Sequence, residues 1–258
     1  MPFLDVNGIS AYYDVTGVGE PVVFLHGGYC SAEVMRELSE QLSRFAVYAP
    51  ERPGHGRTPD RGGEFHYDDG VDDTLAFLDA VGLESAHVVG FSDGANIGML
   101  LALAHPNRVR SLVHISGNLR PGDDVFRADY GERLSAEQHA ESERVSQEFA
   151  ELSPHGPKHV DDVGPRIIQM WLTEPAIEPA SLAEMRMPVL VMAGDGDIIA
   201  QDHTTLIHRS IPGAQLAIVP GSSHLVIRER PVLLGRMLQE FLDGTAGGQP
   251  ERTPDAAR

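Results

Sequence analysis

One stretch of the sequence decides the fold: His87-Val-Val-Gly-Phe-Ser-Asp-Gly-Ala-Asn-Ile-Gly-Met-Leu-Leu-Ala-Leu-Ala-His105. Its first five residues form a short apolar run that predicts a buried strand, and the residues from Gly94 onward predict an apolar helix that stops at Pro106. The next apolar run, from Val109 to Ser116, predicts a second strand. A strand, a helix and a strand in this order indicate two parallel strands joined by a right-handed crossover.

The same alternation continues on both sides of this stretch. Upstream, the pattern predicts strands at residues 9–14, 21–25 and 45–50. It predicts helices at residues 32–42 and 69–81. Downstream, it predicts strands at residues 189–193 and 215–219, and helices at residues 203–210 and 232–242. Repeated alternation of this kind predicts an α/β fold with a mostly parallel central sheet covered by helices on both faces.

Residues 119–187 interrupt the alternation, because they are polar, acidic and helix-forming and contain no buried-strand run. We expect this segment to be a helical lid inserted over the carboxyl edge of the sheet, with an ordinary connecting region as the alternative. The core domain would then consist of residues 1–118 and 188–243. Residues 244–258 lack apolar side chains that could dock, so we expect a disordered tail there.

Composition and charge exclude several classes of protein. The 258 residues are 41% hydrophobic and 22% charged, which suits one large globular domain. The 38 acidic residues against 20 basic ones leave a net charge of −18, which repels nucleic acids and anionic membranes. We expect a monomer or small homo-oligomer. Three features favour a cytoplasmic location. The chain has a single cysteine, Cys30, its first residues do not resemble a signal peptide, and its apolar runs are too short to cross a membrane.

The segment Gly90-Phe-Ser-Asp-Gly94 is a Gly-x-Ser-x-Gly pentapeptide at the predicted turn from strand to helix. A tight turn at this point strains the serine and exposes its hydroxyl, while small neighbours let the two backbones pack. The first N–H groups of the helix can stabilise negative charge on a reacting oxygen. Ser92 is therefore the candidate nucleophile, and a glycine-rich turn with a solvent-facing serine is the alternative.

A serine hydroxyl is a poor nucleophile unless a base removes its proton. His224 is the best candidate base, because it follows the last predicted strand in a loop rich in glycine and serine, at the same sheet edge as the nucleophile. The base needs a carboxylate to fix its tautomer, and the segment Gly194-Asp-Gly-Asp197 offers two. We prefer Asp197, which lies further around the loop, over Asp195, which can instead bond its own backbone as a turn residue.

The segment His26-Gly27-Gly28 ends the second predicted strand and can supply a second contact to a developing oxyanion. Glycines allow a backbone N–H to approach the oxygen without a Cβ in the way. We assign the two donors to the backbone N–H groups of Gly28 and Asp93.

Together these motifs resemble the α/β-hydrolase superfamily from about Val6 to Leu242. Four elements carry the resemblance: His26-Gly27-Gly28, the loop Arg52-Pro-Gly-His-Gly56, the pentapeptide Gly90-Phe-Ser-Asp-Gly94, and the paired Gly-Asp-Gly-Asp and Ser-Ser-His segments. The nucleophile, acid and base follow one another in the order Ser, Asp, His, as in this superfamily. It implies a cofactor-free enzyme that cleaves an ester or related acyl bond through an acyl-enzyme. The Ser-Asp-Gly turn is similar to that of small esterases and carbon–carbon-bond hydrolases, whereas dehalogenases and epoxide hydrolases use an aspartate where Ser92 stands.

A substrate pocket is expected beneath the lid. We assign Met170 and Trp171 of the lid to its wall, with Phe91 and Tyr29 beside the nucleophile, and Leu172 and Ile177 as further apolar candidates; the alternative is that these lid side chains only hold the lid in place.

Asp93 places a carboxylate beside a site that must stabilise an anion. We therefore expect it to pair with Arg52 or Arg57, and an Asn in its place to loosen that loop with little change in acyl chemistry.

A metal site is a weaker possibility. His155 and His159, with Asp161 and Asp162 after them, have the spacing of ligands on one helical face, but two prolines interrupt that face. We expect a solvated loop there, and neither a metal nor another cofactor.

The function favoured by the sequence is an esterase that acts on a small, largely apolar acyl compound. A thioesterase, lactonase, carbon–carbon-bond hydrolase or perhydrolase would use the same residues, and a small-molecule receptor with slow turnover is the alternative from another class.

Overall fold

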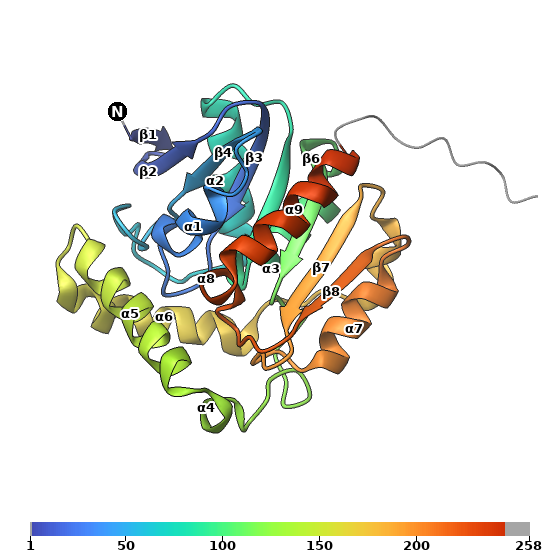
Figure 1. Ribbon diagram of the computed structural model, residues 1–258. Helices are drawn as coiled ribbons and strands as arrows, with labels where there is room; N and C mark the ends of the chain where they lie inside the picture. Colours follow the sequence, from blue (N-terminus) through green and yellow to red (C-terminus); the bar gives the residue numbers. More distant parts are fainter. Residues whose placement is uncertain (1, 246–258) are drawn as a thin grey trace, which may run out of the picture.

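The computed structural model describes residues 2–245, and within them eight strands form one sheet in the order β1-β2-β4-β3-β5-β6-β7-β8. The strands are β1 (Phe3–Val6), β2 (Ile9–Thr16), β3 (Glu20–Leu25), β4 (Phe45–Pro50), β5 (Ala86–Phe91), β6 (Val109–Ile115), β7 (Val189–Gly194) and β8 (Gln215–Val219). Strands β3 to β8 pair in parallel, while β1 and β2 are antiparallel to their neighbours. The predicted α/β fold with a mostly parallel sheet is confirmed (Figure 1).

Helices cover both faces of this sheet, as Figure 1 shows. The described α-helices are α1 (Arg36–Ser39), α2 (Tyr67–Ala80), α3 (Asp93–Ala104), α4 (Tyr130–Arg133), α5 (Ala136–Leu152), α6 (Val160–Thr173), α7 (Gln201–Ser210), α8 (Val226–Glu229) and α9 (Pro231–Thr245). Residues of α1 and α9 share one buried cluster with Val89 of β5, and residues of α2, α3 and α7 share another with Val88. Successive β5 side chains therefore point into opposite cores, which is why this strand is apolar throughout.

Two local features differ from the sequence predictions. The N-terminal strand β1 forms an antiparallel hairpin with β2, although no strand was predicted before residue 9. The helix predicted over 32–42 is a 3-10 turn, Ala32–Met35, followed by the single turn α1.

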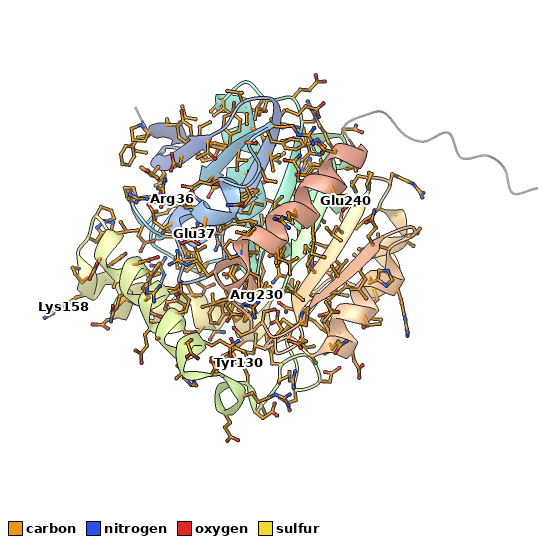
Figure 2. All side chains as sticks on the ribbon, viewed as in Figure 1. Arg36, Glu37, Tyr130, Lys158, Arg230 and Glu240 are labelled. Atoms are coloured by element: carbon orange, nitrogen blue, oxygen red, sulfur yellow. The ribbon has the colours of Figure 1, made fainter. Side chains whose placement is uncertain are left out.

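Helices α4, α5 and α6 come between β6 and β7 in the sequence, and they lie together at one end of the molecule (Figure 1). Short 3-10 turns at Pro157–His159 and Pro179–Glu184 complete this segment. The turn between α5 and α6 carries Lys158, the single lysine of the chain, which is exposed and projects outward in Figure 2. These helices fall within residues 119–187, and the assignment of that range as a lid stays a prediction.

Among the described helices, none is long and apolar enough to cross a membrane. The last helix, α9, continues to Thr245, so it includes the first two residues of the predicted tail. Residues 246–258 of that tail lie outside the described residues.

Candidate active site

Ser92 occupies the sharp turn between β5 and α3. Its backbone has φ 54° and ψ −118°, a left-handed conformation that costs a non-glycine residue free energy. Both glycines of the pentapeptide are needed for close packing: a Cβ at Gly94 would lie 1.9 Å from the Leu25 carbonyl oxygen, and one at Gly90 would lie 2.2 Å from the Gly94 oxygen. Glycine at both positions therefore allows the helix and the sheet to approach closely at the turn that presents the serine.

His224 bridges Ser92 and Asp197. Its Nε2 lies 3.0 Å from Ser92 Oγ, and its Nδ1 lies 2.7 Å from Asp197 Oδ1. An ionised carboxylate can only accept, so Nδ1 carries the proton and Nε2 is free to accept from the serine hydroxyl. The structure thus joins the three side chains predicted from the sequence into one hydrogen-bonded chain.

Asp197 is buried and held by three donors. Besides His224, it accepts hydrogen bonds from the Ile199 N–H at 3.0 Å and from Ser116 Oγ, which lies 2.5 Å from Oδ2. Burial by itself raises the pKa of Asp197, but the charge of His224 and the hydrogen bonds from His224, Ser116 and Ile199 outweigh it and lower this pKa below its usual value. The carboxylate therefore stays ionised at neutral pH.

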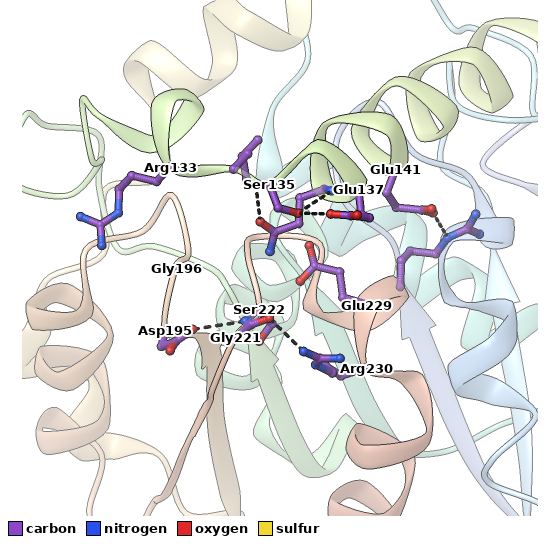
Figure 3. A pocket seen from close by; sticks show the side chains of 13 residues that line it. Arg133, Ser135, Glu137, Glu141, Asp195, Gly196, Gly221, Ser222, Glu229 and Arg230 are labelled. Atoms are coloured by element: carbon purple, nitrogen blue, oxygen red, sulfur yellow. Dashed lines mark hydrogen bonds and ion pairs between the residues drawn. The ribbon is translucent and has the colours of Figure 1, made fainter.

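Asp195 points to a different part of the molecule. It accepts the Ser222 N–H at 3.2 Å and lines a polar cavity of about 590 Å³ on the outer side of this loop (Figure 3). Figure 3 shows Asp195 beside Ser222, below the start of α5. Its contact braces the two loops that follow β7 and β8, so the structure places Asp197, and not Asp195, against the histidine.

The predicted oxyanion donors lie beside Ser92, one at the start of α3 and one on the loop after β3. Asp93 is the first residue of α3, where backbone N–H groups have no partner within the helix. The Gly28 loop passes close by: a Cβ at Gly27 would lie 3.2 Å from Ser92 Cβ, and one at Gly28 would lie 2.6 Å from Asp93 Oδ2. No larger residue than glycine fits at position 28 without displacing its neighbours.

A cavity of about 320 Å³ opens at Ser92 and His224. Most of its wall is apolar, and the side chains responsible are Phe126, Ile168, Trp171, Leu172, Ile198 and Ile199. Its polar lining consists of Tyr67, Asp93, Ser116, Asn118 and Glu174. Of the described residues that line this cavity, none is an arginine or a lysine.

Of the four residues assigned to the pocket from the sequence, Trp171 lines this cavity and the other three do not. Phe91 is buried below the His224 ring, with the ring centroids 5.2 Å apart. Met170 points from α6 into the core, because it lies one residue, about 100° of helix rotation, from Trp171. The Tyr29 ring packs between Phe149 and Trp171. Ile177, a further candidate, is also buried in the core.

Asp93 pairs with Arg52, one of the two predicted partners. Arg52 Nη2 lies 3.5 Å from Asp93 Oδ2. The other carboxylate oxygen, Oδ1, accepts hydrogen bonds from Tyr67 Oη at 3.0 Å and from Trp171 Nε1 at 2.8 Å. Arg57 instead pairs with Glu51 and Glu33.

Comparison with known proteins agrees with this geometry. The family described as alpha/beta hydrolase fold matches residues 20–136. The chain is 30% identical to the putative carbamate hydrolase RutD of Azorhizobium caulinodans, over 93% of this chain and 98% of that protein. The chain belongs to the α/β-hydrolase superfamily. It is a hydrolase.

Solved α/β-hydrolase structures superpose over almost the whole chain. An N-acyl homoserine lactone degrading enzyme matches with a TM-score of 0.76 and 26% identity, over 93% of this chain and 100% of that one. A meta-cleavage product hydrolase from Pseudomonas fluorescens matches with a TM-score of 0.79 and 23% identity, over 94% and 97%. At that identity the second likeness speaks for the fold alone.

The group of possible metal ligands in this α/β-hydrolase differs from the one considered from the sequence. Asp60 joins His159 and Asp162, and their ligand atoms lie within 4.8 Å of one another. However, the Asp60 carboxylate already binds the Arg166 guanidinium, with Nη1 2.5 Å from Oδ2. This network ties α6 to the loop after β4, and we assign it no metal.

Several residues of the α/β-hydrolase site were missed by sequence reasoning. Ser116 directly follows β6, so the rule that placed His224 at a strand end could have found it. Phe126 and Ile199 meet in an isolated bridge between distant segments, and no local pattern marks either of them. Tyr67 and Glu174 likewise reach the cavity only through tertiary packing.

Proposed function

We propose that this α/β-hydrolase cleaves carboxylic esters of small, uncharged and largely apolar acyl groups through an acyl-enzyme. One observation carries the proposal: the hydrogen-bonded chain from Asp197 through His224 ends at Ser92 Oγ, in a cavity whose wall is mostly apolar. A hydroxyl held against a correctly oriented imidazole is the arrangement that makes serine a nucleophile.

In the first half of the reaction, Ser92 Oγ attacks the ester carbonyl carbon while its proton passes to His224 Nε2. Asp197 stabilises the imidazolium that forms. The carbonyl oxygen becomes an oxyanion and accepts hydrogen bonds from the Gly28 and Asp93 N–H groups, each of which typically contributes about 3 kcal/mol to transition-state stabilisation. The imidazolium then donates its proton to the departing alcohol.

In the second half, water attacks the acyl-enzyme. His224 removes a proton from this water, the same two N–H groups stabilise the second oxyanion, and Ser92 regains its proton as the carboxylic acid leaves. These steps require no cofactor.

The charge distribution around the cavity supports an uncharged substrate. Two carboxylates, Asp93 and Glu174, lie in its lining, and the described lining residues include no cationic arginine or lysine. Both carboxylates already hold donors, since Glu174 accepts from His66 Nδ1 at 2.5 Å and from the Tyr67 N–H at 2.9 Å. A substrate with a free carboxylate would meet like charges and find no partner, which raises the free energy of its complex.

A neutral lactone is the second candidate substrate, because a lactone is a cyclic ester and passes through the same steps. It is supported by the mostly apolar cavity wall, which offers no arginine or lysine among its described residues, and by the similarity to the N-acyl homoserine lactone degrading enzyme. A thioester, a carbamate or an activated carbon–carbon bond would use the same three residues.

The test is a panel of p-nitrophenyl esters of graded acyl length, matched neutral lactones and one carboxylate-bearing ester. We expect turnover of short and medium neutral esters near the enzyme median of about 10 per second. Ser92→Ala should lower it by at least about 10⁴-fold. The carboxylate-bearing ester should have the lowest kcat/KM of the panel.

Labelling with a fluorophosphonate separates an enzyme from a receptor. Fast labelling that is lost in Ser92→Ala, together with turnover, supports hydrolysis. Labelling without turnover of any acyl compound in the panel would favour a slow receptor and contradict the proposal.

A further inference from the structure

The peptide between Gly27 and Gly28 is held firmly from one side. The Gly27 carbonyl oxygen lies 2.9 Å from Arg52 Nη2 and 2.8 Å from His26 Nδ1. Arg52 Nη2 also reaches the His26 carbonyl oxygen at 3.3 Å. One guanidinium therefore binds two consecutive carbonyls of the loop that carries Gly28.

The protonation of His26 agrees with this arrangement. Its Nε2 lies 3.1 Å from the Arg52 backbone N–H and accepts from it, so the ring proton is on Nδ1 and is donated to the Gly27 oxygen. Burial, and next the charge of Arg52, hold the pKa of His26 well below its ordinary value, so the ring stays neutral. The neutral ring can therefore accept from the Arg52 N–H at Nε2 while it donates to the Gly27 oxygen from Nδ1.

Holding a carbonyl also orients the next N–H. In a trans peptide the C=O of one residue and the N–H of the following residue point in opposite directions. The two donors on the Gly27 oxygen therefore set the direction of the Gly28 N–H, a group with no side chain of its own to orient it. A donor that is already oriented stabilises an oxyanion without reorganisation during the reaction.

Asp93 keeps the guanidinium in place. The side chains of Arg52 and Asp93 are 12% and 3% exposed, so each would be a costly buried charge without the other. The second oxygen of Asp93 is held by the Tyr67 hydroxyl and the Trp171 indole N–H. This carboxylate therefore connects the guanidinium behind the Gly28 loop with α2 and with α6.

We propose that Arg52, held by Asp93, is a positioning residue that sets the Gly28 N–H for the oxyanion. The inference rests on the proposed function, and it differs from the purely loop-holding role expected for Asp93 because it predicts that Asp93→Asn also lowers kcat. It predicts that loss of Arg52 weakens binding of the transition state while leaving ground-state binding nearly unchanged.

The main variant is Arg52→Met, which removes the donors and the charge but keeps an unbranched apolar side chain in place of the aliphatic part of arginine. The kcat for the best p-nitrophenyl ester should fall on the order of 10²-fold, the range seen when an oxyanion donor is lost or misplaced by about 1 Å, with KM changing less than about threefold. The inhibition constant of a boronic acid, which forms a tetrahedral adduct with serine, should rise by a similar factor. Arg52→Lys should recover part of the activity.

Arg57→Met is the matched control, because Arg57 belongs to the same loop and to a partly buried ion pair, and its side chain bonds Glu51 and Glu33 rather than residues 26–28. Its kcat should stay within about threefold of wild type, whatever its thermal midpoint. Asp93→Asn, alone and combined with Arg52→Met, completes a cycle in which the two losses should be strongly non-additive.

A folded Arg52→Met protein with wild-type kcat and unchanged boronic acid affinity would overturn the inference. So would equal kcat losses in Arg52→Met and Arg57→Met, or failure of both Arg52 variants to fold, since either result would make the pair structural. Failure of the proposed function looks different: wild type and Ser92→Ala would then hydrolyse the esters equally or not at all.

Discussion

The floor and the wall of the cavity are built in different ways. The floor, Ser92, Asp197 and His224, stands on loops at the ends of β5, β7 and β8, and Asp197 is 1% exposed. The wall formed by α6 presents Ile168, Trp171 and Leu172, and Leu172 is 66% exposed. Hydrogen bonds position the floor, whereas apolar contacts form most of the wall.

This difference suggests that the floor carries out the reaction and that the wall determines which substrates bind. The parallel sheet brings the ends of its strands to one edge, so the floor moves only if the core moves. The helix α5 behind the wall buries only Val145 and Phe149 among its 17 residues, so the helical segment depends on few core contacts. We infer that changes in the floor alter reaction rate and changes in the wall alter the choice of substrate.

The largest effect is expected from the acid of the floor. Asp197→Asn should lower kcat on the order of 10⁴-fold, because an amide can donate to Nδ1 and leave the histidine in the wrong tautomer. Asp195→Asn is the matched control and should keep kcat within about threefold, since Asp195 only braces Ser222. The ester assay measures both variants, and a stronger loss in Asp195→Asn would reverse the assignment of the acid.

A second prediction concerns the pH stability of the core beneath the floor. Burial, with a smaller contribution from His203, lowers the pKa of His114 from 6.5 to about 4. The unfolded chain binds a proton at His114 at a higher pH than the folded chain does. The contribution of the neutral His114 to the free energy of unfolding is therefore complete above pH 6.5 and is lost as the pH falls toward 4. The free energy of unfolding in urea should drop by about 3 kcal/mol from this residue alone.

His114→Leu keeps a similar volume and removes the titrating group. Its unfolding free energy should therefore depend less on pH between 6.5 and 4 than that of wild type. Equal slopes for the two proteins would show that His114 is solvated or protonated in the folded state.

The smallest effect is expected in the wall. Leu172→Ala should leave kcat for an acetyl ester unchanged and lower kcat/KM for longer acyl chains about tenfold, the order of a few methylene contacts. Leu233→Ala on α9 is a matched control, because it makes the same change at an exposed leucine, 44% accessible, outside the cavity lining. Equal losses at every chain length would place Leu172 outside the substrate path.

The floor was predictable from the sequence because strand ends are local features. Ser92 directly follows the fully buried β5, Asp197 lies three residues after the fully buried β7, and His224 lies five residues after β8. The parallel topology then brings these strand ends together without any knowledge of side-chain packing. The sequence favoured Asp197 over Asp195 only by its place in the loop, and the hydrogen bonds of the two carboxylates show which one faces His224.

The wall was not predictable in the same way. Met170 and Trp171 are neighbours in the sequence, but a rotation of about 100° along α6 sends one into the core and the other into the cavity. Phe126 lies outside every regular element and reaches the cavity through a bridge to Ile199. Such contacts depend on how the segment docks, which no local pattern records.

The position of Lys158 has a practical consequence. Because it is the only lysine and lies at the exposed turn between α5 and α6, amine-reactive reagents at alkaline pH have one side-chain target, next to the helix α6 that lines the cavity. A single dye attached there would report movement of these helices when ligand enters, and coupling to a solid support through it would orient every molecule alike. The buried thiol of Cys30, whose pKa burial raises to about 12, would not compete.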